Sequence, residues 1–342
     1  MTTLIAPKDG AVVPLQTQNQ KAFVEHVQRG AWPRGNIKNL DWMHLERQEK
    51  EDYTTPLKVE FRFRSDENPV RLSWADNPYF ENAETVMAED TVTVGNLKAN
   101  TKYYWKVNDS EVWCFLTEEA APRWIEAGGL TNIRDIGGWS TARGWRVRQG
   151  CIYRGSEMDT HHTMTESGLH TLRDTLKIKT DLDVRSEAAG RLRQSPLGEG
   201  VRLVLLPLPA YSALLEGTPE IKNNLRCLFE TMADSDNYPI YFHCWGGADR
   251  TGTVVFLLNA LLGVPCEDLM LDYELTSLSV WGIRSREGAL FSAFMEALNG
   301  YEGASVNQKA ESFLRSCGIR GETLASLRYN LWEKGAGRCD GL

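Results

Sequence analysis

Cys244 and Arg250 are separated by five residues, and their surroundings predict a site for a bound anion. The apolar run 240–242 predicts a buried strand before them, and the apolar run 254–262 predicts a buried helix after them. A glycine-containing loop between a strand and a helix N-terminus directs backbone N–H groups and the positive helix end toward one point. We expect a thiolate nucleophile at Cys244, while the planar fork of Arg250 can bind two phosphate oxygens.

The loop, His243-Cys-Trp-Gly-Gly-Ala-Asp-Arg-Thr-Gly252, resembles the phosphate-binding loop of the protein tyrosine phosphatase superfamily. It is similar to one bacterial branch of tyrosine phosphatases that also act on phosphoinositides. The resemblance implies phosphate monoester hydrolysis through a phosphocysteine on Cys244, with Thr251 bonded to the thiolate. It implies that His243 supports the loop. The residues implied in substrate binding are Trp245, Gly246, Gly247, Ala248, Arg250 and Arg185.

Three further segments extend this resemblance to about residues 130–335. Thr131-Asn-Ile-Arg-Asp-Ile-Gly-Gly-Trp139 resembles the branch's Asn-x-Arg-Asp-x-Gly-Gly segment, which implies supporting roles for Asn132 and Asp135. The segment 147–155 resembles the strand that follows it in the branch. Asp183-Val-Arg-Ser-Glu187 is similar to the branch's Asp-Leu-Arg-Ser segment.

A general acid must protonate the leaving oxygen, and the sequence offers three candidates. No Trp-Pro-Asp occurs, and no Asp lies between Val184 and Ala233. Asp249 is therefore the first candidate, as myotubularin-type phosphatases also have Asp immediately before the Arg. Asp183 is the second candidate and Glu216 the third. The alternatives are that Asp249 is a helix N-terminal charge and that Asp183 forms a salt bridge to Arg185.

Substrate preference is indicated by Ala248, where the bacterial branch often has Lys. Without that cation we expect a tyrosine or dual-specificity phosphatase acting on a phosphotyrosine protein or a small phosphorylated substrate. The alternatives are an inositol-phosphate or phosphoinositide phosphatase and a phosphoprotein-binding module without turnover. The chain has six His and lacks the ligand strings of a dinuclear phosphatase, so we expect no metal and no cofactor.

The catalytic region is predicted to be an α/β fold, because strands and helices alternate from about residue 130. Strands are expected at 178–184 and 201–206, and a helix with one apolar face is expected to begin at Pro219. Terminal helices are expected at 310–314 and 322–332. This alternation predicts a mainly parallel central sheet flanked by helices, with the site at the carboxyl ends of its strands.

A different pattern precedes this region, because 56–117 alternates apolar and polar residues and predicts about six short strands of a β-sandwich. Leu97-Lys-Ala-Asn-Thr-Lys-Tyr103 resembles the tyrosine corner of fibronectin type III and immunoglobulin-like domains. Its expected role is a spacer, with protein or glycan binding as the alternative. We predict an N-terminal segment 1–50 packed on the β domain, a β-sandwich at 51–120 and a phosphatase domain at 121–342.

Composition excludes several classes of protein. The 342 residues carry a net charge of −8, which gives no electrostatic footprint for nucleic acid or an anionic membrane. No apolar run is long enough to span a membrane. The seven cysteines lack a Cys-x-x-Cys pair, which argues against a disulfide framework. A cytoplasmic location is expected, with secretion after loss of a signal peptide as the alternative.

Overall fold

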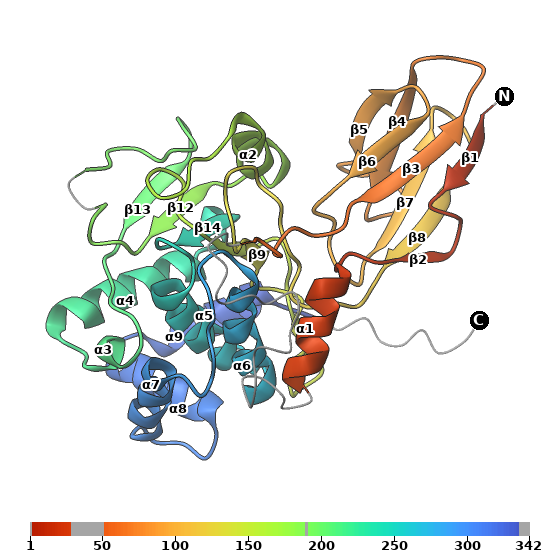
Figure 1. Cartoon of the computed structure of the whole chain (residues 1–342). Coiled ribbons are helices and arrows are strands. Elements are labelled where there is room, and N and C mark those ends of the chain that lie inside the picture. The colour runs from red at the N-terminus through yellow and green to blue at the C-terminus, as the bar shows by residue number, and fades with distance from the viewer. Residues whose placement is uncertain (1, 29–50, 189–190, 335–342) are drawn as a thin grey trace. The chain divides into compact units, whose positions relative to one another are not determined.

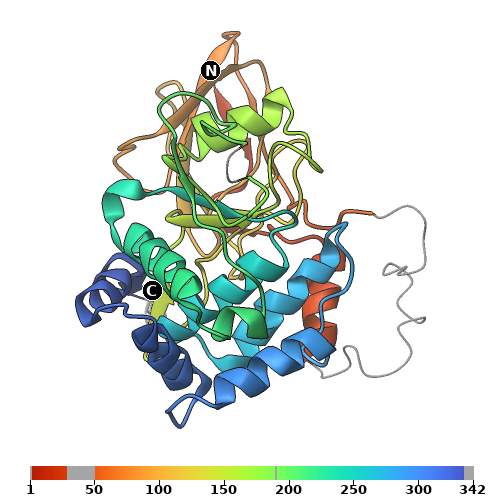
Figure 2. The same ribbon diagram turned by 90° about the vertical axis from the view of Figure 1, so that its left-hand side faces the viewer.

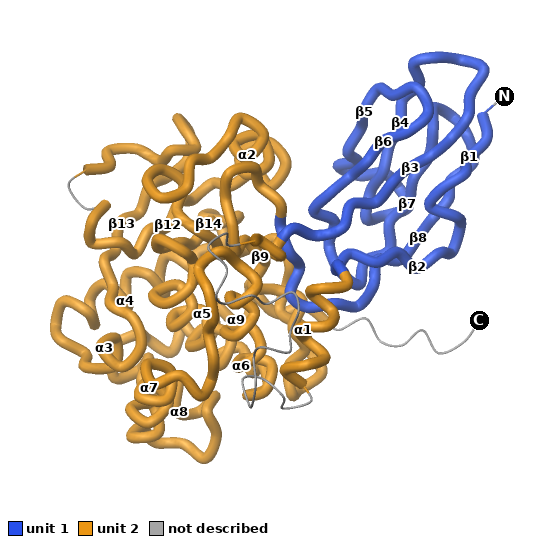
Figure 3. Tube along the Cα trace, viewed as in Figure 1, with its two compact units in different colours: residues 1–17, 55–125 blue, residues 18–54, 126–342 orange. Residues whose placement is uncertain are grey.

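The structure, a computed structural model, describes residues 2–28, 51–188 and 191–334. The chain divides into two compact units, each built from two stretches of sequence (Figure 3). One unit contains residues 1–17 and 55–125, and the other contains residues 18–54 and 126–342.

This division differs from the predicted boundaries. Residues 1–17 supply two strands to the β unit, whereas the helix α1 (Gln18–Gln28), the next described element, belongs to the larger unit. In that unit Gln20 donates a hydrogen bond to the carbonyl oxygen of Tyr53, and α1 packs against α6 (Cys266–Glu274). Residues 29–50 of the predicted N-terminal segment, including Trp32-Pro33-Arg34, lie outside the described residues.

The smaller unit consists of two sheets (Figure 1). One has the strand order β1-β3-β6, and the other has the order β2-β8-β7-β4-β5. The sequence pattern predicted about six strands in 56–117, and six are present there; the first two strands of the chain were not predicted. The strands are β1 (Thr3–Ala6), β2 (Ala11–Val13), β3 (Val59–Arg64), β4 (Val70–Ala75), β5 (Glu84–Ala88), β6 (Thr91–Val94), β7 (Lys102–Val107) and β8 (Trp113–Thr117).

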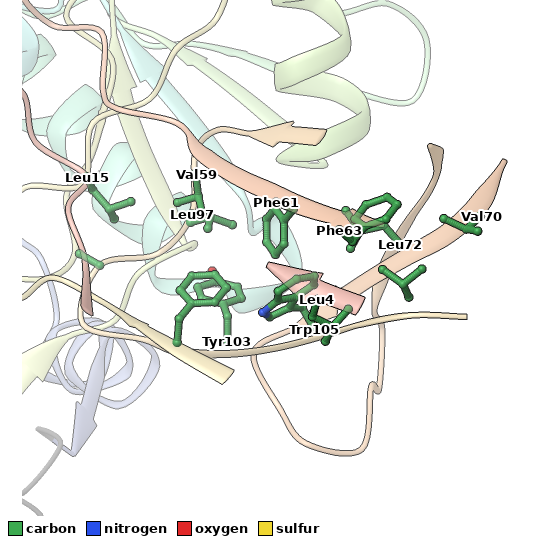
Figure 4. Packing of buried hydrophobic residues seen from close by; sticks show 13 residues of the cluster. Leu4, Leu15, Val59, Phe61, Phe63, Val70, Leu72, Leu97, Tyr103 and Trp105 are labelled. Carbon is green, nitrogen blue, oxygen red and sulfur yellow. The ribbon is translucent and has the colours of Figure 1, made fainter. Parts of the chain in front are cut away.

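Side chains from both sheets meet in one hydrophobic core (Figure 4). Phe61 of β3 is fully buried and makes an edge contact with Trp105 of β7, with ring centroids 5.3 Å apart. The hydroxyl of Tyr103 accepts a hydrogen bond of 2.9 Å from the backbone N–H of Lys98. This bond closes the turn that the sequence likened to a tyrosine corner, and the fibronectin type III resemblance itself stays a prediction.

The larger unit contains a five-stranded sheet with the order β13-β12-β14-β11-β9. The pairs β13–β12, β12–β14 and β14–β11 are parallel, and the edge strand β9 is antiparallel to β11. The predicted mainly parallel sheet is therefore present in this unit. Its strands are β9 (Arg134–Asp135), β11 (Ile152–Gly155), β12 (Thr180–Asp183), β13 (Arg202–Leu205) and β14 (Ile240–His243).

Helices flank this sheet in both views (Figures 1 and 2). Local sequence explains several helix starts: Thr218 caps the helix that begins at Pro219, and Ser305 with Gln308 forms a capping box. The remaining elements are α2 (Glu166–His170), α3 (Ser212–Leu215), α4 (Pro219–Ala233), α5 (Asp249–Leu261), α7 (Ala289–Asn299), α8 (Val306–Ser316), α9 (Gly321–Leu331), β10 (Trp145–Val147) and β15 (Trp332–Lys334).

The helix α5 is central to this unit, and every residue from Thr251 to Leu261 is buried. This agrees with the apolar run at 254–262, which has no polar face. The strand β14 ends at His243, and α5 begins at Asp249, so the residues between them form a short turn at the carboxyl edge of the sheet. That position is where an open parallel sheet places a ligand.

Candidate active site

The loop between β14 and α5 places Cys244 at the end of a fully buried strand, with its own side chain almost entirely enclosed. The carbonyl oxygen of Cys244 is 3.2 Å from Nδ1 of His243. The carbonyl oxygen of Trp245 accepts a hydrogen bond of 2.8 Å from the backbone N–H of Glu157. Both carbonyls are therefore bound by groups of the surrounding protein.

The next two carbonyl oxygens are bound in the same way. The Gly246 oxygen accepts a hydrogen bond of 2.8 Å from Nδ2 of Asn132. The Gly247 oxygen accepts one of 2.6 Å from Nη2 of Arg154. Four successive carbonyls thus face the protein. In a trans peptide the N–H points away from its carbonyl, so the N–H groups of residues 245–248 are directed to the opposite side of the loop.

Within the described parts of the chain, these N–H groups have no protein acceptor. The first N–H groups of α5 also lack intrahelical partners, as at any helix N-terminus. Together they form a cradle of donors at the positive end of the helix, which is the geometry of an anion site.

Two glycines allow this path of the backbone. A Cβ on Gly247, which has φ of +62°, would lie 2.3 Å from the carbonyl oxygen of Gly155. A Cβ on Gly246 would lie 2.6 Å from the indole of Trp281. Any side chain at either position would displace backbone or a packed ring.

Arg250 lies beside the cradle and makes a two-bond ion pair with Glu187, with contacts of 3.1 and 3.2 Å. This hydrogen bonding lowers the pKa of Glu187 to about 2. The guanidinium also lies over the Trp245 ring, 5.5 Å from its centroid. Its orientation is therefore set by one carboxylate and one aromatic ring, and Glu187 is a partner to which the sequence assigned no role.

Asp249 is held by two side chains from outside the loop. Its carboxylate accepts hydrogen bonds of 2.7 and 3.0 Å from Nε and Nη2 of Arg284, and a short one from the hydroxyl of Tyr211. Burial alone would lower the pKa of Arg284, but the pair with Asp249 outweighs burial and raises it. Arg284 is a partner of the loop to which the sequence assigned no role.

Tyr211 has a backbone conformation that is uncommon for a residue with a side chain, with φ of +57°. Its hydroxyl lies 2.9 Å from that of Tyr273, and burial raises the pKa of both phenols, that of Tyr273 to about 12. Both tyrosines therefore stay protonated at neutral pH, and Tyr211 donates to Asp249. A strained residue that reaches the loop in this way suggests a functional constraint.

His243 is buried and makes a second hydrogen bond, in which its Nε2 lies 2.8 Å from Oδ1 of Asp181. Burial would lower its pKa, but the carboxylates of Asp183 and Asp181 outweigh burial and raise the pKa to about 9. At neutral pH His243 is thus an imidazolium that donates to both Asp181 and the Cys244 carbonyl. The supporting role of His243 stays a prediction.

Thr251 is buried in the first turn of α5, and its hydroxyl has no hydrogen-bond partner among the described residues. The predicted bond to the thiolate is not formed here. A buried hydroxyl normally has a partner, so this one is available to a group that enters the cradle.

Asp183 and Arg185 are brought together, but away from solvent. Nε and Nη2 of Arg185 bind the Asp183 carboxylate, and Nη1 binds Glu157 at 2.8 Å and pairs with Asp159 at 2.9 Å. Both Asp183 and Arg185 are at most 1% exposed. This arrangement favours the salt-bridge alternative for Asp183 and gives Arg185 a structural role, because its fork is already occupied by carboxylates.

Glu157 organises the segment beside the loop, and nothing in its sequence context indicated this role. Its carboxylate accepts backbone hydrogen bonds from residues 159–162. Burial would raise its pKa, but these bonds outweigh burial and lower the pKa to about 2. The segment it holds includes His161 and His162.

An aromatic rim, defined here as Trp245, Trp281, His161 and His162, borders the cradle. His161 makes an edge contact with Trp245, with ring centroids 4.9 Å apart. Nε1 of Trp281 donates a hydrogen bond of 3.0 Å to Nε2 of His162. Trp245 is 36% exposed, so its ring is accessible to a molecule bound at the loop.

The other predicted residues have supporting contacts or none. Asp135 accepts hydrogen bonds from the backbone N–H groups of Gly137 and Gly150, at 2.9 and 2.6 Å. Glu216 is exposed at the end of α3, and no contact given by the structure connects it to the loop. Across the described ranges, no group of three His, Cys, Asp or Glu residues could hold a metal ion. No described helix is both long and apolar enough to cross a bilayer.

Comparison with known proteins gives a sequence match and a weaker structural one. Residues 125–333 match the tyrosine phosphatase family. A Cupriavidus necator protein named "Putative tyrosine-protein phosphatase" is 27% identical over an alignment of 169 residues, which covers 42% of this chain and 59% of that protein. The chain thus spans about three-fifths of the length of this curated relative.

Among solved structures, the core catalytic domain of the PP-IP phosphatase SIW14 from S. cerevisiae, in complex with citrate, is 20% identical to this chain. The likeness covers 42% of this chain and 78% of that one, with a TM-score of 0.29. At this TM-score the likeness carries no argument.

Proposed function

Because the chain belongs to the tyrosine phosphatase family through residues 125–333, we propose that it hydrolyses phosphate monoesters and prefers phosphotyrosine. The observation that carries the proposal is the orientation of the loop. Four successive carbonyls from Cys244 to Gly247 are bound by the protein, so the amides between them face the site. A buried thiol next to such a cradle is placed to attack a bound phosphorus atom.

In the first step, the Cys244 thiolate attacks phosphorus in line, and the bond to the ester oxygen breaks. The leaving oxygen takes a proton from a general acid. The loop amides and Arg250 bind the equatorial oxygens as charge develops on them. In the second step, water attacks the phosphocysteine, and phosphate leaves as the thiolate forms again. The unpartnered hydroxyl of Thr251 is available to stabilise that thiolate.

We assign the proton transfers to Asp249. It is the first residue of α5 and adjoins Arg250, and Asp183, the second candidate, is bound to Arg185 and buried. The carboxylate of Asp249 is bound by Arg284 and by the hydroxyl of Tyr211. This arrangement suits the second step, in which Asp249 accepts a proton from water. For the first step, Asp249 must carry a proton and separate from Arg284.

The preference for phosphotyrosine rests on the surroundings of the cradle. The accessible ring of Trp245 can pack against the flat leaving group of an aryl phosphate. An inositol polyphosphate would need several free cations, but Ala248 supplies none, and the neighbouring arginines are each paired with a carboxylate. Apart from Arg250, which binds the reacting phosphate, these pairs are Arg284–Asp249 and Arg185–Asp183.

A substrate panel tests the proposal. Wild-type protein and Cys244→Ser should be assayed side by side on phosphotyrosine peptides, phosphoserine peptides and inositol phosphates. We expect turnover of phosphotyrosine by the wild type alone, and inhibition by vanadate. Faster release of phosphate from inositol phosphates would mean that these are the preferred substrates. Binding of phosphopeptide without turnover would mean that the protein is a binding module and not an enzyme.

A further inference from the structure

Asp272 of α6 binds two buried arginines at once. Its Oδ1 accepts a hydrogen bond of 2.9 Å from Nε of Arg134, and its Oδ2 accepts one of 2.6 Å from Nη1 of Arg154. Both arginines are fully buried, and the Asp272 side chain is 7% exposed. We call these three residues the buried triad. Removing charge from such a cluster leaves the remaining charges uncompensated, so its members are strongly coupled.

Each arginine of the triad is connected by hydrogen bonds to a carbonyl oxygen of the loop. Arg154 donates directly to the oxygen of Gly247 through Nη2. Arg134 donates through Nη1 to Oδ1 of Asn132, whose Nδ2 donates to the oxygen of Gly246. One carboxylate outside the loop therefore sets the direction of two successive peptide groups within it.

The triad also carries charge. Burial and the neighbouring Arg134 lower the pKa of Arg154 to about 10, which still leaves it protonated at neutral pH. Burial would raise the pKa of Asp272, but the two arginines outweigh burial and lower it. Two cations and one anion leave one positive charge in excess. Arg154 donates to the oxygen of Gly247, three residues after Cys244 in the same loop, so this charge lies beside the loop that carries the thiol.

We propose that Asp272 is a positioning residue of the phosphatase site, an inference that rests on the proposed function. Through Arg134 and Arg154 it turns the amides that follow Gly246 and Gly247 toward the bound phosphate. The same triad keeps an excess positive charge beside the Cys244 thiolate. Asp272 itself touches neither the thiol nor the loop backbone; it acts through the arginines.

The test uses variants that separate the peptide contacts from the charge. Asn132 has φ of +59°, so Asn132→Gly retains the backbone conformation and removes only the side-chain bonds to Gly246 and Arg134. Arg154→Met removes both contact and charge, and Arg154→Lys restores the charge without the fork. Asp272→Asn leaves two buried cations without their carboxylate and is the variant most at risk of not folding.

Arg328→Met is the matched control. Arg328 also binds a carboxylate and a backbone carbonyl, those of Glu311 and Leu261, but Leu261 is the last residue of α5, at the end opposite the cradle. Two quantities are measured on folded protein: the Kd of vanadate, and the rate at which iodoacetamide alkylates Cys244, followed by peptide mass spectrometry.

We expect Asn132→Gly to weaken vanadate binding roughly tenfold with little effect on alkylation. Arg154→Met should weaken binding at least as much and slow alkylation by a similar factor, and Arg154→Lys should restore alkylation but not binding. Arg328→Met should change neither quantity. Wild-type values in both Asn132→Gly and Arg154→Met would overturn the inference. Absence of phosphatase activity in the wild type would overturn the proposed function. It would not overturn the inference about Asp272, because alkylation is measured without substrate.

Discussion

Asp249 and Arg284 form a two-bond ion pair across 35 positions of sequence, with contacts of 2.7 and 3.0 Å. The same carboxylate is the first candidate for the general acid. The proposed proton transfer therefore depends on the segment before α7, because Arg284 lies in that segment. The same segment places Trp281 against Gly246. The helix α7 itself packs into the unit through Phe291 and Phe294.

Loss of the nucleophile should abolish turnover. We expect Cys244→Ser to lower kcat for an aryl phosphate by at least about 10⁴-fold, because the hydroxyl is a far weaker nucleophile than the thiolate. Cys227→Ser on α4 is the control and should retain wild-type kcat. Full activity in Cys244→Ser would exclude the phosphocysteine route.

The acid role of Asp249 predicts a dependence on the leaving group. Asp249→Asn should slow release of a poor leaving group roughly 10²-fold and that of a good one much less, since only the poor one needs a proton. Rates over a series of substituted aryl phosphates check this. Equal losses across the series would remove Asp249 as the acid.

The ion pair between Asp249 and Arg284 should affect how well Asp249 acts as the general acid. Arg284→Gln frees Asp249 from its cation, so turnover of poor leaving groups should rise, because the acid no longer has to separate from Arg284 in the first step. In the Asp249→Asn background the same substitution should have little effect. A double-mutant cycle measures the coupling, expected to be on the order of tenfold. Additive effects would mean that Arg284 acts on something other than Asp249.

His243 predicts a pH dependence of stability. Its pKa in the folded protein is raised from 6.5 to about 9, so the stabilisation is fully present below pH about 6.5 and is lost as pH rises through about 9. A shift of this size corresponds to roughly 3 kcal/mol. Urea unfolding between pH 6 and pH 9 should show this loss in the wild type but not in His243→Asn. The exposed His170→Asn is the control and should follow the wild type.

Trp245 should affect aryl substrates more than small phosphates. We expect Trp245→Leu to raise KM for a phosphotyrosine peptide about 3- to 10-fold while KM for an alkyl phosphate changes little. Trp145→Leu on β10 removes a ring of the same exposure away from the loop and should leave both values unchanged. A parallel rise for both substrates would show that the ring only maintains the loop.

Much of the site could be predicted because it is local in sequence. The residues from His243 to Gly252 contain the nucleophile, the glycines and the helix start, and local chemistry dictates how they fold. The buried apolar runs likewise indicated β14 and α5. Asn132 was found through a short motif, although its contact with Gly246 spans 114 positions.

The partners of these residues could not be predicted, because they depend on tertiary contacts. Asp272 resembles any acidic residue on a helix until the fold places two buried arginines beside it. Glu157, Tyr211 and Glu187 are likewise ordinary in sequence. The strands β1 and β2 were missed because short strands near a terminus show little periodicity.

Those two strands have a consequence for dissecting the protein. β1 lies at the edge of one sheet and β2 at the edge of the other, and Leu4 of β1 belongs to the core between them. A fragment that starts at residue 51 would therefore lose an edge strand from each sheet and expose the backbones of β3 and β8. Unpaired edges of this kind recruit other chains, so such a fragment should self-associate, and the β unit can be isolated only if residues 1–17 are joined to residue 55 by a linker.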